Sequence, residues 1–357
     1  LLAAGRAAEQ GDREAVGAIV AELTRLHHGA TDCDQTRAIV AAGVAELRQV
    51  LEGITLLREQ TPRSRALLAS FGERLCAPLL AAHLRALDLP SEAVDARQLV
   101  VTDDRFDGAT VALEPTRRRV LEHLPPRVDQ GAVPVVTGFL GATPEGVTTT
   151  LGRGGSDYSA TLLASLLHAA EVWIWTDVDG ILTADPRLVS EARTLTQVSY
   201  REAAEMSYFG AKVIHPRTMV PAMQAGIPIR IRNTLNPQHP GTLITEESPL
   251  LPGRVKTITA IPDLALVTID GRGMVGSVGV ARRIFEATEA SETNVIMISQ
   301  ASSEQTVSIV VPEIDAPRLV QALRQRLAHE LSIGAVEAIN NKPQIAVASI
   351  IGRGMAG

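Results

Sequence analysis

The chain has 357 residues, enough for two or three domains, and its 45% hydrophobic and 21% charged residues are ordinary for a globular protein. The formal net charge of −6 argues against a nucleic-acid partner, and no apolar run approaches the roughly 20 residues of a membrane span. Cys33 and Cys76 have neither disulfide-scaffold nor zinc spacing, which favours a reduced, cytoplasmic setting. Leu1 lies inside a helical pattern and Gly357 just after a glycine-rich turn, so we expect a fragment cut at both ends.

The first 85 or so residues are predicted to be helical. Apolar residues recur at helical spacing within 14–26, and the same character returns within 67–87. Strand-like runs then alternate with helical ones, at 98–102, 133–137, 172–175 and 227–231. VPVVT and VWIW are continuously apolar, which predicts parallel strands buried on both faces. This alternation predicts an α/β sandwich.

A linker with two prolines and a glycine at 246–253 separates this α/β region from a C-terminal region with a different order of predicted elements. The order strand, helix, strand, strand, helix, strand predicts a ferredoxin-like βαββαβ module, with these elements at 264–269, 278–288, 294–299, 306–311, 317–327 and 345–350. LALVTIDGRGMVG (264–276) recurs as IAVASIIGRGMAG (345–357). This repeat predicts a tandem of small modules, of which the second is truncated.

The segment LGRGGSDYSA (151–160) is the most informative motif. Its glycines precede a helical pattern, so backbone N–H groups can face an anion, and Arg153 adds a fork that suits a carboxylate or phosphate. Other polar loops follow the apolar runs, where ligands of open α/β sheets bind: TDVDG, ADPR and, after IPIRI, Asn233. A Walker A pattern and an EF-hand are both absent. Lys212 is one of three lysines and a candidate site residue, whereas His215 before proline is interpreted as structural.

The motifs TGFLG, LGRGGSDYSA, WTDVDG, ADPR, SYFGAKVIHPRT and IRNT, in this order, closely resemble those of aspartate kinase in the amino-acid kinase superfamily. The resemblance covers essentially the whole chain. It implies a three-layer αβα kinase domain over 1–248, a first ACT module over 255–340, and the start of a second, truncated module over 341–357.

The resemblance also implies a reaction. Aspartate kinase uses ATP and Mg²⁺ to phosphorylate the β-carboxylate of L-aspartate, the first step towards lysine, threonine and methionine. The attacking carboxylate is already ionised at neutral pH, since its pKa is about 3.9, so positioning and electrostatics carry the catalysis rather than a general base.

The family's site residues map onto matching positions. Arg153 corresponds to the partner of the substrate α-carboxylate and Glu73 to the partner of the α-amino group. The positions around aspartate and the transferred group are Phe139, Ser156 and Asp157. The nucleotide-site positions are Thr176, Asp177, Leu182, Arg187, Lys212 and Val213. Lys212, on the phosphates, and Asp157 are the catalytic assignments. No residue is assigned as a metal ligand, and Leu182 replaces a tyrosine common in the family.

ACT modules pair between chains and bind amino-acid effectors, which implies a homodimer or larger assembly. Gln300 lies in NVIMISQASSE, which is similar to the threonine-sensing form of the module. Threonine is therefore the favoured effector, with lysine as the alternative. The family's opening KFGG-type strand and loop, which holds the phosphates, has no counterpart here, so we expect the fragment to be inactive or nearly so by itself.

Three alternatives stay open at this point. One is another amino-acid kinase, although such kinases lack SYFGAKVIHP combined with tandem ACT modules. Another is a non-catalytic amino-acid sensor that acts as a regulatory subunit. The third is the kinase part of a bifunctional aspartate kinase–homoserine dehydrogenase.

Overall fold

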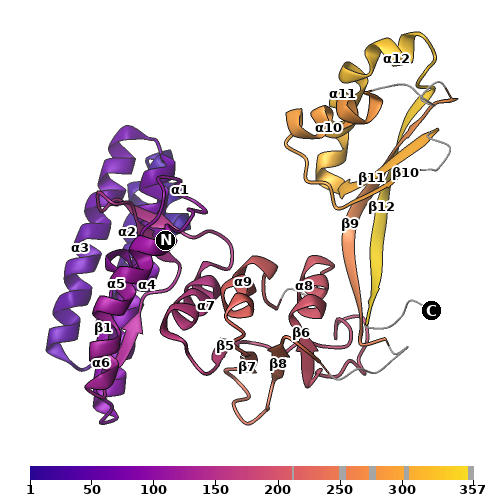
Figure 1. Cartoon of the computed structure of the whole chain (residues 1–357). Coiled ribbons are helices and arrows are strands. Elements are labelled where there is room, and N and C mark those ends of the chain that lie inside the picture. The colour runs from indigo at the N-terminus through magenta and orange to yellow at the C-terminus, as the bar shows by residue number, and fades with distance from the viewer. Residues whose placement is uncertain (211–212, 249–254, 273–278, 301–304, 353–357) are drawn as a thin grey trace. The chain divides into compact units, whose positions relative to one another are not determined.

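The computed structural model describes residues 1–210, 213–248, 255–272, 279–300 and 305–352 (Figure 1). Contacts within the chain define two compact units. The first holds most of residues 1–248, and the second holds the C-terminal part together with 182–193 and 208–210. None of the helices in these ranges is both long and apolar enough to cross a bilayer.

The N-terminal helices of the first unit pack around a shared apolar cluster. Phe71, Leu47, Leu51 and Leu68 are all fully buried in it. Side-chain caps set two of the helix starts, since Asp12 accepts a hydrogen bond from Ala15 N–H and Thr61 accepts one from Ser64 N–H. The helical predictions for 14–26 and 67–87 are confirmed. These helices are α1 (Leu2–Gln10), α2 (Arg13–Gly29), α3 (Asp34–Leu57) and α4 (Pro62–Ala86).

Three small sheets follow in the first unit. β1 (Ser91–Val94) pairs in parallel with β2 (Val133–Val136), and β3 (Leu140–Ala142) pairs antiparallel with β4 (Thr148–Thr150). A mixed sheet has the order β5-β7-β8-β6, in which β5 and β7 are parallel. Its strands are β5 (Val172–Thr176), β6 (Gln197–Ser199), β7 (Ile229–Asn233) and β8 (Thr242–Thr245). The helical elements between the strands are η1 (Ala96–Gln98), α5 (Leu113–His123), α6 (Pro125–Asp129), α7 (Gly155–Leu167), α8 (Tyr200–Tyr208) and α9 (Pro216–Gln224).

The strand predicted at 98–102 is wrong. The chain instead forms the short helix η1, started by the side chain of Asp95, and Val100 N–H still donates to Ala96 C=O. Only Val101 and Thr102 make isolated bridges. The apolar run reflected complete burial of this segment rather than strand geometry, and the true strand, β1, lies just upstream in a less apolar sequence.

The prediction that VPVVT and VWIW are buried on both faces is also wrong. In β5, Val172 and Ile174 are buried, whereas Trp173 is 48% exposed and Trp175 46% exposed. The Arg232 guanidinium lies 4.9 Å from one indole centroid and 5.2 Å from the other, which gives the two rings a cation–π partner. In β2, Val133 is exposed and the next three residues are half-buried. The described residues therefore cover one face of β5 only.

The second unit is a four-stranded antiparallel sheet with the order β10-β11-β9-β12 and helices packed on it. The apolar sides of α10 and α11, with Ile284 and Leu319, pack against sheet residues such as Val267 and Ile309. The predicted βαββαβ order is confirmed. Its elements are β9 (Thr257–Asp270), α10 (Val280–Ala290), β10 (Met297–Gln300), β11 (Thr306–Pro312), η3 (Glu313–Asp315), α11 (Ala316–Arg326), α12 (Ala328–Ser332) and β12 (Ala338–Ile351).

The two copies of the sequence repeat lie in β9 and β12. Residues 347–351 of the second copy pair with 257–261, upstream of the first copy. Asp263 (φ 58°) and Gln344 (φ 56°) adopt left-handed conformations near the register shifts that divide this long ribbon. Within the described residues, the second copy thus extends the same sheet, and residues 353–357 lie outside them.

Candidate active site

The glycine-rich motif forms the entry to α7. Gly154 is left-handed (φ 69°), and a Cβ there would lie 2.8 Å from Thr218 Cγ2, so a larger residue would disturb this turn. Gly155 begins the helix. Arg153 is exposed beside this helix start and makes no side-chain hydrogen bond or ion pair with the described residues. A helix N-terminus and an available guanidinium together suit a carboxylate or phosphate ligand.

The segment that follows β2 lies against this helix start. Gly138 approaches so closely that a Cβ on it would be 3.1 Å from the Ser156 Cβ. Phe139 is left-handed (φ 66°), which is unusual for a bulky residue, and its N–H donates to Ser159 Oγ at 3.0 Å. Phe139 C=O accepts from Leu151 N–H at 2.9 Å. Both backbone groups of Phe139 are therefore held by the motif.

Glu73 reaches the same place from α4. Ser156 Oγ donates to Glu73 Oε1 at 3.4 Å, and the backbone N–H of Gly138 lies near the same carboxylate. Burial raises the pKa of Glu73, and these two neighbours oppose that rise. Burial also raises the pKa of Asp157 in the first turn of α7. The structure thus brings together the predicted residues Glu73, Phe139, Ser156 and Asp157, with Arg153 on the same turn.

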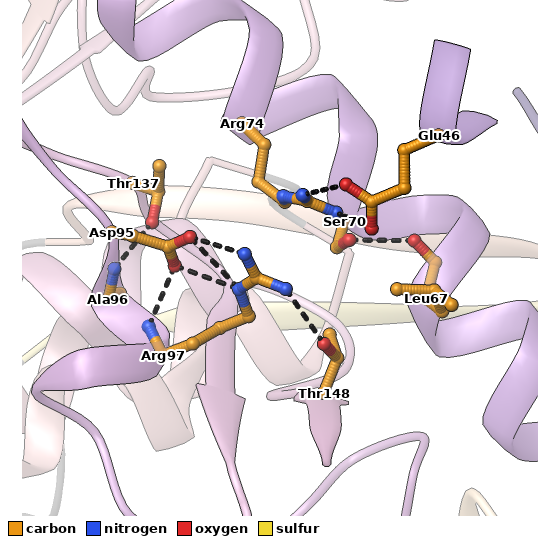
Figure 2. Close-up of polar contacts among 9 residues, drawn as sticks. All are labelled: Glu46, Leu67, Ser70, Arg74, Asp95, Ala96, Arg97, Thr137 and Thr148. Atoms are coloured by element: carbon orange, nitrogen blue, oxygen red, sulfur yellow. Dashed lines mark hydrogen bonds and ion pairs between the residues drawn. The ribbon is translucent and has the colours of Figure 1, made fainter. Parts of the chain in front are cut away.

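A set of polar contacts holds the segments that carry Gly138 and Glu73 (Figure 2). Thr137, the last residue before Gly138, accepts a hydrogen bond from Ala96 N–H at 2.8 Å. Arg97 binds Asp95 and also donates to Thr148 Oγ1 on β4 at 3.1 Å. Burial raises the pKa of Asp95, but the Arg97 hydrogen bonds outweigh it and lower the pKa overall.

The helix that carries Glu73 is fixed in the same layer. Arg74, the next residue on α4, pairs with Glu46 on α3, with one N–O distance of 3.1 Å (Figure 2). Its guanidinium also lies 4.6 Å from the centre of the Phe71 ring. The pairing of Arg74 with Glu46 therefore restrains the rotation of α4, the helix that carries Glu73.

The loop after β5 carries two predicted nucleotide-site residues. Thr176 Oγ1 donates to Asp177 Oδ1 at 3.1 Å, and the Asp177 side chain is exposed. Asp179 accepts from Asn233 Nδ2 at 2.8 Å, which joins the carboxyl ends of β5 and β7. The sequence analysis named the TDVDG loop and Asn233 as polar positions after apolar runs, but it did not predict that Asp179 and Asn233 bond to each other. That contact depends on β5 and β7 being adjacent in the sheet.

The remaining predicted residues are distributed as follows. Leu182 and Arg187 belong to the second unit, where Arg187 pairs with Asp185 at 2.7 Å and lowers the pKa of Asp185 to about 2. Val213 is half-buried, and Lys212 lies outside the described residues. His215 Nδ1 accepts from Arg217 N–H and begins α9, which confirms its structural interpretation.

The predicted effector residue lies at the end of a strand in the second unit. Gln300 is the exposed last residue of β10 and pairs with Val307, while residues 301–304 lie outside the described part. Among the described residues, three or more acidic, histidine or cysteine side chains never gather as a metal cluster. Mg²⁺ usually takes one or two carboxylates together with phosphates and water, so single groups such as Asp157 or Asp177 fit that chemistry.

Comparison with known proteins assigns the family. A family model for the amino acid kinase family matches residues 11–233, more than half of the chain, and a model for an ACT domain matches residues 267–327. The chain belongs to the amino acid kinase family. The resemblance inferred from the motifs is thereby confirmed, as is the α/β fold followed by a ferredoxin-like ACT module.

Curated relatives of this family member are larger proteins. Bifunctional aspartokinase/homoserine dehydrogenase 1, chloroplastic, of Arabidopsis thaliana is 38% identical over 322 residues, which cover 88% of this chain and 35% of that protein. The bifunctional aspartokinase/homoserine dehydrogenase of Haemophilus influenzae is 36% identical and is covered to 39%. The chain therefore spans about a third of the length of these relatives.

Solved structures agree with the fold. E. coli aspartokinase III in complex with aspartate and ADP (R-state) matches with a TM-score of 0.72 and 31% identity, covering 88% of this chain and 69% of that one. The same enzyme with lysine and aspartate (T-state) matches with a TM-score of 0.70 and 34% identity, covering 86% and 68%.

Proposed function

We propose that this chain carries the substrate-binding and effector-binding parts of an aspartate kinase, which transfers the γ-phosphoryl group of ATP to the β-carboxylate of L-aspartate. One observation carries the proposal. Glu73, from a helix about 80 residues upstream, meets Ser156 in the first turn of α7, and the exposed Arg153 lies on the turn that leads into this helix. A carboxylate on α4 and a guanidinium just before α7 provide opposite charges for the two ends of an amino acid.

The aspartate part of the site follows from these charges. Arg153 binds the α-carboxylate, because its planar fork matches a carboxylate in two hydrogen bonds. Glu73 binds the α-ammonium, and that positive charge offsets the burial that raises the pKa of Glu73. Phe139 and Ser156 shape the space between them, and Asp157 lies one residue further along the first turn of α7.

The nucleotide part of the proposal uses the loop after β5 and the predicted residues beyond it. Asp177 lies near the nucleoside and Lys212 on the phosphates. The other nucleotide-site positions in this proposal are Thr176, Leu182, Arg187 and Val213. Mg²⁺ bound with the ATP phosphates would neutralise negative charge on the transferred group, and the Lys212 ammonium would neutralise more of that charge. Since the acceptor carboxylate is ionised at neutral pH, the residues bind, orient and stabilise rather than remove a proton.

The binding of an amino-acid effector is supported by the ACT domain and by the lysine complex of E. coli aspartokinase III. We favour threonine as the effector because the sequence around Gln300 resembles the threonine-sensing form, with lysine as the alternative, and we propose a homodimer or larger assembly through the ACT modules. The domain limits 1–248, 255–340 and 341–357 belong to the same proposal. A cytoplasmic or other reducing compartment fits the two exposed, unpaired cysteines.

The deciding experiment measures aspartate-dependent ADP release by the purified full-length protein while threonine and lysine are titrated. Arg153→Ala should raise the KM for aspartate by roughly 10- to 100-fold, since a charge-assisted hydrogen bond contributes about 1.5–3 kcal/mol, and should leave the KM for ATP nearly unchanged. Arg118→Ala, which removes an exposed arginine from α5, is the matched control. Equal effects on both KM values would contradict the assignment of Arg153.

The alternatives predict other results. Amino-acid binding without aspartate-dependent ADP release would favour a regulatory sensor. Inhibition by lysine alone would support the kinase assignment and identify lysine, rather than threonine, as the effector. Homoserine dehydrogenase activity in the same protein would identify a bifunctional enzyme, as in several curated relatives.

A further inference from the structure

A buried hydroxyl lies between the two segments that form the candidate aspartate site. Ser159 is 3% exposed and sits one helical turn into α7. Its Oγ accepts the Phe139 N–H at 3.0 Å and donates to Gly155 C=O at 2.9 Å. One side chain thus connects the segment after β2 with the first residue of the helix that follows the Arg153 turn.

The hydroxyl holds a backbone that would otherwise relax. Phe139 has φ 66°, a conformation that costs a non-glycine residue free energy and persists only where its surroundings enforce it. Leu151 N–H binds the Phe139 carbonyl, and Ser159 is the partner of the Phe139 N–H. Removing the Ser159 oxygen would leave this N–H unpaired in a partly buried place, and an unpaired donor there favours another conformation.

Phe139 in turn fixes the residue that contacts Glu73. Gly138 immediately precedes it and packs within 3.2 Å of Ser156 atoms, as measured from its ideal Cβ, and Ser156 Oγ donates to the Glu73 carboxylate at 3.4 Å. A rotation of the Phe139 backbone therefore shifts Gly138 against Ser156, and with it the contact that orients Glu73. The nucleotide-site residues Thr176 and Asp177 share none of these hydrogen bonds.

We propose that Ser159 is a positioning residue that holds Phe139 in its left-handed conformation and thereby sets the affinity of the site for the amino-acid substrate. This inference rests on the proposed aspartate kinase function. Ser159 does not contact the substrate, and its effect passes through Phe139 and Gly138.

The test compares Ser159→Ala with Ser165→Ala in the purified full-length protein. Ser165 lies on the same helix and donates to Leu162 C=O at 2.8 Å, so it controls for the loss of a serine hydroxyl from α7. Hydrogen exchange of the Phe139 amide should accelerate about tenfold or more in Ser159→Ala and remain at the wild-type rate in Ser165→Ala. The KM for aspartate should rise about tenfold in Ser159→Ala, with the KM for ATP within about twofold.

Two further variants cover a failure of Ser159→Ala to fold. Ser159→Thr keeps the hydroxyl and should retain near wild-type values, whereas Ser159→Cys replaces it with a weaker acceptor and should give intermediate values. Unchanged exchange and unchanged aspartate KM in Ser159→Ala or Ser159→Cys would overturn the inference, and so would equal rises in both KM values. If the wild-type full-length protein shows no aspartate-dependent turnover, the proposed function itself fails.

Discussion

Replacing Gly155 with alanine tests the close contact at the start of α7. A Cβ on Gly155 would lie 2.7 Å from Phe139 Cδ2, 3.2 Å from Leu151 Cβ and 3.3 Å from Phe139 Cα. The first of these distances is shorter than real Cβ contacts, so the ring or the helix start must move. Gly155 does not have a positive φ, which means that the obstacle is the missing space rather than the backbone conformation.

The magnitude follows from two opposing effects. Overpacking a well-packed site costs about 1–3 kcal/mol. Replacing a helical glycine with alanine, where the backbone allows it, raises the free energy of unfolding by about 0.4–1 kcal/mol because it lowers the conformational entropy of the unfolded chain. We therefore expect Gly155→Ala to lower the free energy of unfolding by about 1–2 kcal/mol. Gly17→Ala, on the exposed side of α2 with nothing within 4 Å of its Cβ, should instead raise it by about 0.5–1 kcal/mol.

The assay is urea unfolding followed by tryptophan fluorescence. Both tryptophans of the chain, Trp173 and Trp175, lie on β5 in the first unit, so the signal reports on the unit that contains both glycines. Opposite signs for the two alanine variants would support the geometry at Phe139. An equal stabilisation by both variants would refute the argument that the Phe139 side chain fills the space beside Gly155.

Two predictions concern titrating groups. Because burial raises the pKa of Asp157 above 3.8, the folded state binds its proton more tightly than the unfolded state, and stability falls as the pH rises through and above that value. Asp157→Asn should therefore raise the urea midpoint at neutral pH, with a difference that disappears at pH values below 3.8; a lower midpoint at neutral pH would contradict this. Arg187→Ala should return the pKa of Asp185 from about 2 towards 3.8, measured by NMR titration of the carboxyl carbon, and a pKa that stays near 2 would show that another group lowers it.

Sequence periodicity predicted the regular elements where one signal dominates. The helices within 14–26 and 67–87 emerged because a single apolar stripe at helical spacing packs on one core. The strand at 98–102 failed because complete burial makes a continuous apolar run in a helical turn as readily as in a strand. The prediction that β5 is buried on both faces failed for a related reason. An apolar run does not require burial, and Trp175 is exposed beside the guanidinium of Arg232.

The sequence likewise revealed only those site residues that belong to a local motif. Arg153, Ser156 and Asp157 were accessible to motif reasoning, because they follow one another in a glycine-rich turn before a helix. Ser159 was missed, since a serine within an apolar helical pattern gives no signal of its own until its partner is known. Its partner, Phe139, is 20 residues away along the chain and joins it only through a tertiary hydrogen bond.

By itself the sequence determined the family, the order of an α/β kinase domain and an ACT module, and most of the candidate residues at the aspartate site, because motifs and periodicity are local properties. Tertiary structure alone decided that Glu73 meets Ser156, that Phe139 is held in a left-handed conformation and that one face of β5 is uncovered within the described residues. These features depend on contacts between segments distant in sequence, and their geometry is set by which side chains compete for the same space.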